Sequence, residues 1–101
     1  MSFEKRLEKA VEKKEKEIEK EKQRITLLQS KLDSSKITRA EFNIKRKRIE
    51  EKIRALDSRM RVLQGGLTRE KRHQEELAEK KQKEKEEKMK KKEKKNKRKE
   101  E

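Results

Sequence analysis

The sequence contains no cysteine, proline, tryptophan or tyrosine, and only two glycines and two phenylalanines. Without cysteine, the chain forms neither disulfides nor thiolate metal sites and has no cysteine nucleophile. Without proline, and with its glycines adjacent as Gly65 and Gly66, it has few of the residues that interrupt helices and build turns. Two aromatic rings are too few to form the stacking platforms that hold unpaired bases in many RNA-binding domains.

Apolar residues are scarce as well, at 25% of the 101 residues, whereas 57% are charged. Globular domains have about 45 to 50% apolar residues, so this chain can line a seam but cannot fill a spherical core. It has no apolar run of about 18 residues that would span a membrane, and no signal-peptide core near Met1. We therefore expect an intracellular protein without membrane insertion, cytoplasmic or nucleoid-associated in a prokaryote and nuclear or nucleolar in a eukaryote.

Good helix formers dominate the remainder, and apolar residues recur among them at steps of three, four or seven. This spacing is that of a coiled-coil seam. The predicted seam residues are Leu7, Val11, Ile18, Ile25 and Leu28 in a first helix, and Phe42, Ile49, Ile53, Leu56, Met60 and Leu63 in a second. The fold class is therefore all-α.

The polar cluster Asp33-Ser34-Ser35 favours a turn between the two helices. Thr38 and Glu41 then have the spacing of a capping box, which predicts a new helix start. We predict an antiparallel helical hairpin over residues 1–67, with helices at about 3–32 and 38–64 and a turn at 33–37.

Folding the chain at this turn places Leu7 opposite Leu63 and Lys14 opposite Leu56. Lys14, Glu21 and Arg46 stand at seam positions that favour apolar groups. Since Glu21 and Arg46 fall in neighbouring layers, we expect them to form an ion pair that fixes the register.

Residues 68–101 form a second predicted domain, a highly charged helix with a lysine-rich tail. Gly65 and Gly66 cost a continuous helix about 2 kcal/mol relative to alanines, so a kink and a full break are both compatible with the sequence, and a break is slightly favoured. Beyond them, Glu-to-Lys pairs four residues apart, from Glu76 with Lys80 to Glu87 with Lys91, support a helix to about Met89. Mutual repulsion of the lysines that follow predicts a frayed tail.

No set of residues indicates catalysis. His73 is the only histidine, whereas metal ligation and acid–base catalysis need several convergent groups in an enclosed pocket. No phosphate-binding glycine loop is present. We expect a protein that is not an enzyme and has no cofactor, metal or small-molecule substrate.

The basic residues remain as candidates for function, because the formal net charge is +14. We predict binding to the phosphate backbone of nucleic acid, either duplex DNA or structured RNA, without strong sequence specificity. The lysine-rich tail resembles those of chromatin-associated and ribosome-associated proteins. The predicted contact residues are Lys45, Lys47, Arg48, Lys52, Arg54, Arg59, Arg61, Arg69, Lys71 and Arg72, followed in the tail by Lys90, Lys91, Lys92, Lys94, Lys95, Lys97, Arg98 and Lys99.

A second interpretation explains the same residues differently. A charged helical surface can simply be solvated, and the chain would then be a structural coiled-coil adaptor or oligomerisation module with no nucleic-acid role. A homo-oligomer is compatible with either interpretation.

Overall fold

The computed structural model describes residues 2–100, and the side chains of residues 2–96. This part of the chain forms two α-helices, α1 (Phe3–Asp33) and α2 (Arg39–Glu100), and no strand. The predicted all-α fold class is thus confirmed. The chain divides into two compact units, Met1–Leu67 and Thr68–Glu101, which are described separately here.

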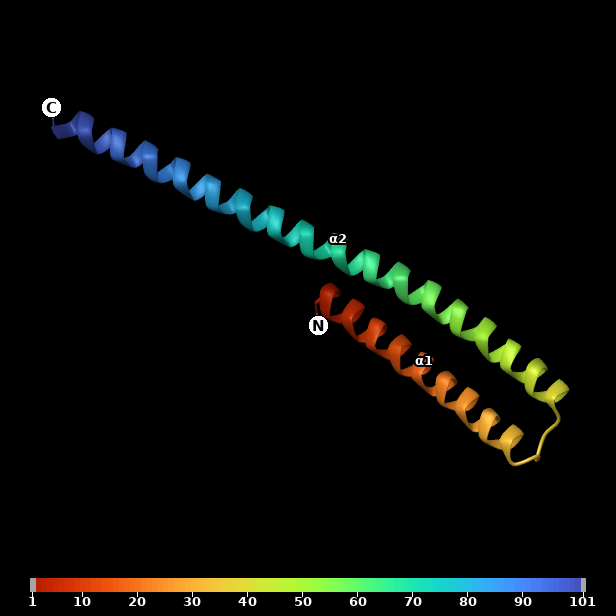
Figure 1. The fold of residues 1–101 in the computed structure, drawn as a ribbon. Coiled ribbons are helices and arrows are strands. Elements are labelled where there is room, and N and C mark those ends of the chain that lie inside the picture. Colours follow the sequence, from red (N-terminus) through yellow and green to blue (C-terminus); the bar gives the residue numbers. More distant parts are fainter. Residues whose placement is uncertain (1, 101) are drawn as a thin grey trace. The chain divides into compact units, whose positions relative to one another are not determined.

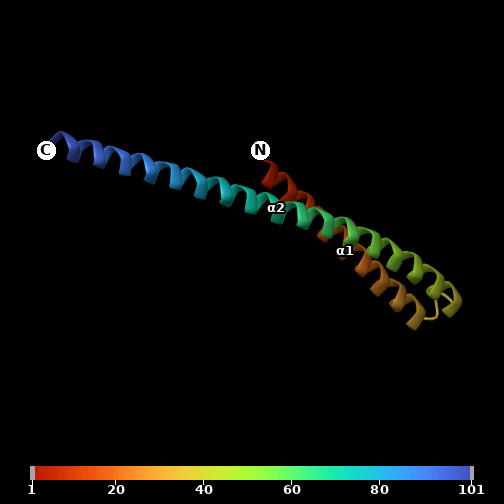
Figure 2. The ribbon, with the colours of Figure 1, turned by 90° about the horizontal axis from the view of Figure 1, so that it is seen from above.

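In the first unit, α1 and residues 39–67 of α2 lie side by side and run antiparallel, joined by a short turn (Figures 1 and 2). Among the described side chains, five apolar residues are buried between them: Val11, Ile18, Leu28, Phe42 and Leu56. Leu7, Ile25, Ile49, Ile53, Met60 and Leu63 are half-buried. Every predicted seam residue therefore lies at least partly inside the hairpin, whereas Phe3, which the same spacing would place opposite Leu67, is 60% exposed.

The turn between the helices is closed by backbone hydrogen bonds. The Lys36 N–H donates to the Lys31 carbonyl at 2.8 Å, and the Ser35 N–H donates to the Leu32 carbonyl at 3.0 Å. This pair of bonds is the Schellman arrangement, which requires a left-handed residue just beyond the helix end. Ser35 supplies it with φ 58°, at a position where glycine is the usual residue.

Side-chain caps fix the start of each helix. The Ser2 hydroxyl accepts from the Lys5 N–H at 3.2 Å, and the Thr38 hydroxyl accepts from the Glu41 N–H at 3.2 Å. Each bond satisfies an N–H that has no partner within the helix. The Thr38 bond is the one that the capping-box spacing predicted.

The pairing of the helices is shifted from the predicted register. The turn lies between Asp33 and Arg39 and is centred on Lys36, later than predicted. Leu7 lies near Gly66, three residues beyond its predicted partner Leu63: a Cβ placed on Gly66 would lie 3.9 Å from a Leu7 methyl carbon. Lys14 likewise lines one surface hollow together with Arg59 and Leu63, which are three and seven residues beyond its predicted partner Leu56. A one-residue change in the turn is enough to shift contacts along the whole hairpin.

The break expected at Gly65–Gly66 is not formed, because α2 is helical through both residues. Neither glycine has a positive φ. Packing of this part of α2 against Leu7 helps to offset the helix cost of the two glycines. The helix also continues past Met89 to Glu100, where fraying was expected.

Candidate functional site

The charges of α1 are segregated around its axis. Five of its seven glutamates, Glu4, Glu8, Glu12, Glu15 and Glu19, recur at steps of three or four, so they form one stripe. The basic residues Arg6, Lys13, Lys20, Arg24 and Lys31 recur at steps of seven or four and form a separate stripe on the other flank of the seam. All five basic residues are exposed.

The basic residues of α2 divide in the same manner. Lys45, Arg48, Lys52 and Arg59 form one exposed stripe at steps of three, four and seven. On the other flank, Asp57 pairs with Arg61 at 3.0 Å and Glu50 pairs with Arg46 at 3.6 Å. The carboxylates of this segment therefore neutralise the second flank and leave the first flank positive.

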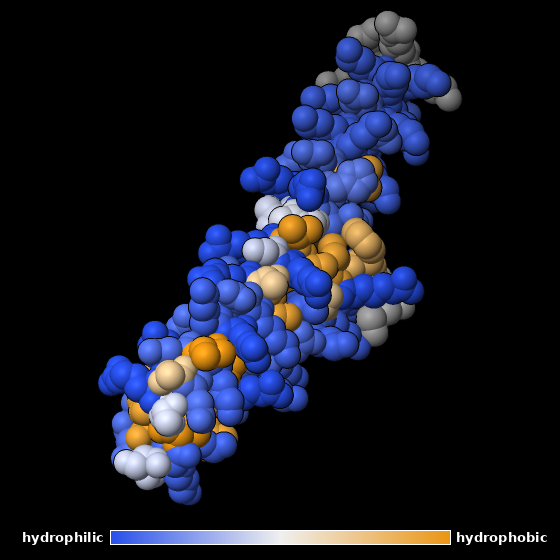
Figure 3. Space-filling view, turned by 90° about the vertical axis from the view of Figure 1, so that its right-hand side faces the viewer, coloured by the Kyte–Doolittle hydropathy of each residue, from blue (hydrophilic) through white to orange (hydrophobic). Residues whose placement is uncertain are grey.

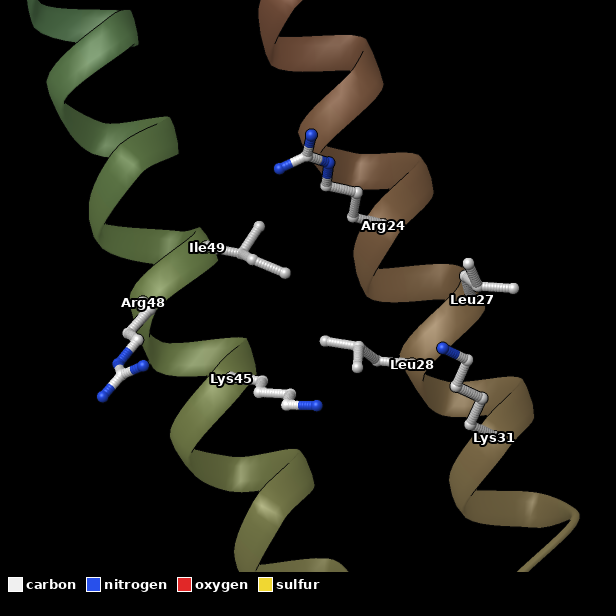
Figure 4. A pocket seen from close by; sticks show the side chains of 7 residues that line it. All are labelled: Arg24, Leu27, Leu28, Lys31, Lys45, Arg48 and Ile49. Carbon is white, nitrogen blue, oxygen red and sulfur yellow. The ribbon is translucent and has the colours of Figure 1, made fainter. Parts of the chain in front are cut away.

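The two positive stripes lie on the same side of the hairpin. Near the turn, Arg24 and Lys31 of α1 and Lys45 and Arg48 of α2 line one groove, as Figure 4 shows. We call this side the basic face, and it consists of Arg6, Lys13, Lys20, Arg24, Lys31, Lys45, Arg48, Lys52 and Arg59. Two carboxylates, Glu17 and Glu41, fall on the same stripes, and Glu17 pairs with Lys14 at 3.4 Å.

Glu21 is the one charged residue that is buried among the described side chains, at 5% exposure. Its Oε1 atom lies 3.0 Å from Lys52 Nζ and 3.5 Å from an Arg24 guanidinium nitrogen. Its Oε2 atom is buried and has no hydrogen-bond partner. Glu21 thus pairs with two cations of the basic face through Oε1, whereas its Oε2 atom is buried in the seam without a hydrogen-bond partner.

The predicted Glu21–Arg46 ion pair is therefore wrong. Arg46 pairs instead with Glu50, and its guanidinium carbon lies 5.3 Å from the centre of the Phe42 ring. Its side chain is 46% exposed, so it occupies the edge of the seam rather than a layer within it. The shifted register brings Lys52, not Arg46, within reach of Glu21.

We expect Glu21→Leu to stabilise the hairpin by about 1 to 4 kcal/mol, because an apolar side chain can replace a buried carboxylate without a desolvation cost. Lys52 and Arg24 are more than half exposed, so water can solvate both when the carboxylate is gone. Urea unfolding followed by helical circular dichroism measures the change. The control Glu17→Leu removes a more exposed carboxylate, with a side chain 37% exposed against 6% for Glu21, and should change stability by less than about 1 kcal/mol. A less stable Glu21→Leu protein would contradict the argument.

The structure brings together only some of the contact residues predicted from the sequence. Lys45, Arg48, Lys52 and Arg59 lie on the basic face, whereas Lys47 and Arg54 are exposed on the surface of α2 away from α1, and Arg61 is paired with Asp57. The five basic residues of the α1 stripe were not among the contact residues predicted from the sequence. Their spacing of seven from Arg6 to Lys13 to Lys20 was the available signal.

The other predicted contact residues belong to the second unit. Its described side chains between residues 71 and 96 are all exposed. Within these residues, the predicted Glu-to-Lys pairs do not close into ion pairs. Gln74 Nε2 donates a hydrogen bond to Glu70 Oε1 at 3.0 Å. Lys97, Arg98 and Lys99 lie outside the residues whose side chains are described.

Apolar side chains on the surface occur in small groups enclosed by hydrophilic ones, as Figure 3 shows for one face. Within the described part of the chain, no helix is long and apolar enough to cross a membrane. No cluster of three or more acidic or histidine side chains gathers there to hold a metal ion. No protein-family model, curated protein or solved structure matches the chain.

Proposed function

We propose that this protein is a non-enzymatic helical hairpin that binds the phosphate backbone of nucleic acid through its basic face. The observation that carries the proposal is the segregation of charge. Basic residues from both helices share one side of the hairpin, while most glutamates of α1 and the paired acids of α2 occupy other sides. A charged surface that served only solubility would not need this separation.

The dimensions of the basic face suit a duplex. Lys31 lies 25 positions after Arg6, which at a rise of about 1.5 Å per residue is a span of about 37 Å. This is close to one turn of duplex, about 34 to 36 Å. Arginine forks and lysine ammonium groups along this length can contact phosphates without reading base edges. The expected binding is therefore indifferent to sequence.

The salt dependence of binding tests the proposal. With roughly eight phosphate contacts, log K should fall with log salt at a slope of about −7, so a fourfold rise in salt should weaken binding by about 10⁴. Fluorescence anisotropy on two DNA duplexes of unrelated sequence and on one RNA hairpin stem measures affinity and slope together. The two DNA duplexes should give the same values.

The competing adaptor interpretation expects no such binding. Solvated lysines on a spacer release no counterions from a nucleic acid. Absence of binding to every duplex at micromolar protein and low salt would therefore reject the proposal. A strong preference for one sequence would reject the backbone-contact mechanism.

A further inference from the structure

A shallow groove of about 300 Å³ lies on the basic face between α1 and α2, near the turn. Its apolar part is formed by Leu27, Leu28 and Ile49. Leu28 and Ile49 point toward one another from the two helices, and Lys45 extends toward α1, whereas Leu27 and Arg48 point away from the space between the helices in this view (Figure 4). No carboxylate lines the groove. The four remaining lining residues are all basic: Arg24, Lys31, Lys45 and Arg48.

Leu27 is exposed without an evident structural need. It is 57% exposed in a chain of which only 25% is apolar, whereas its neighbour Leu28 is buried in the seam. A second apolar spot occurs at the other end of the hairpin, where Val62 and Leu63 lie beside Arg59 and Lys14. Both spots thus combine apolar contact area with basic neighbours.

We propose that the groove at the turn binds an acidic amphipathic α-helix of a partner protein. Apolar residues three or four apart on such a helix would cover Leu27, Leu28 and Ile49, as in helix-in-groove recognition. Carboxylates on the edges of the helix would pair with the basic rim. This inference goes beyond the proposed nucleic-acid role, although the two ligands would share Arg24, Lys31, Lys45 and Arg48.

Charge and apolar content together select this occupant. Phosphates would satisfy the rim but leave the apolar floor exposed to water. A second copy of the chain carries a net charge of +14, and its acidic stripe from Glu4 to Glu19 contains no apolar residue that could fill the floor. An acidic helix with an apolar face satisfies both parts of the groove.

A synthetic peptide of about three heptads provides the probe, with leucine at the seam positions and glutamate at the flanking positions. The intact protein should bind it, and a peptide with lysine in place of each glutamate should not bind. Leu27→Ser should weaken binding about tenfold, since it removes roughly half of the burial energy of one leucine. Fluorescence anisotropy with labelled peptide measures both effects.

Ile44→Ser is the matched control. Ile44 is 56% exposed, almost the same as Leu27, and it does not line the groove. Equal losses for the two variants, no loss for Leu27→Ser, or equal binding of both peptides would overturn the inference. Duplex binding should be unchanged in Leu27→Ser, so a failure of the peptide to bind is distinguishable from a failure of the nucleic-acid proposal. If Leu27→Ser weakened duplex binding as much as peptide binding, the groove would be a nucleic-acid site and the inference would be overturned.

Discussion

Leu56→Asp should unfold the hairpin and abolish its cooperative melting transition. Leu56 is 6% exposed, among the five buried apolar residues of the hairpin. An aspartate there would bury an uncompensated charge between the helices, at a cost of about 3 to 5 kcal/mol. Since small domains are stable by only about 5 to 15 kcal/mol, and this hairpin has few buried groups, the loss should be decisive. Helical circular dichroism during heating measures it.

Val62→Asp controls for the effect of adding a carboxylate to α2. Val62 is 72% exposed and lies on the same helix, so its replacement should change stability by no more than about 0.5 kcal/mol. If both variants melted like the parent protein, the seam would not be what holds the helices together. If both unfolded, the loss of positive charge rather than burial would be responsible.

Reversing charge on the basic face should weaken duplex binding about a hundredfold or more at low salt. The double variant Lys45→Glu with Arg48→Glu removes two phosphate contacts and adds two repulsive charges, and the salt slope should become shallower by about 2. Within the described residues neither side chain forms an ion pair, so the folded hairpin should be retained. Anisotropy across a salt series gives both quantities.

Lys47→Glu with Arg54→Glu is the matched control, because it changes one lysine and one arginine of the same helix. Both residues are exposed but lie outside the basic face. The two variants have equal net charge, so an effect of overall charge alone would weaken binding equally. Equal losses would therefore show that the segregation of charge has no role in binding.

The sequence was sufficient to predict the seam and the fold class. Burial in a two-helix hairpin follows from the spacing of apolar residues along each helix, which is a local property. Thr38 could be identified as a cap for the same reason, since its bond to the Glu41 N–H spans only three residues. Helix continuity at Gly65 and Gly66 was not predicted, because the local helix cost of the two glycines does not include contacts between helices, such as that of Gly66 with Leu7.

The register and the candidate site needed the tertiary structure. Glu21 pairs with Lys52 and Arg24, and not with Arg46. The turn also lies one residue later than predicted, because its position is weakly encoded by a run of short polar residues. The sequence alone also does not show which basic residues lie on the same side of the hairpin. Only the pairing of the two helices places Arg24 and Lys31 beside Lys45 and Arg48, because residues from different helices become neighbours through packing and not through their spacing in the chain.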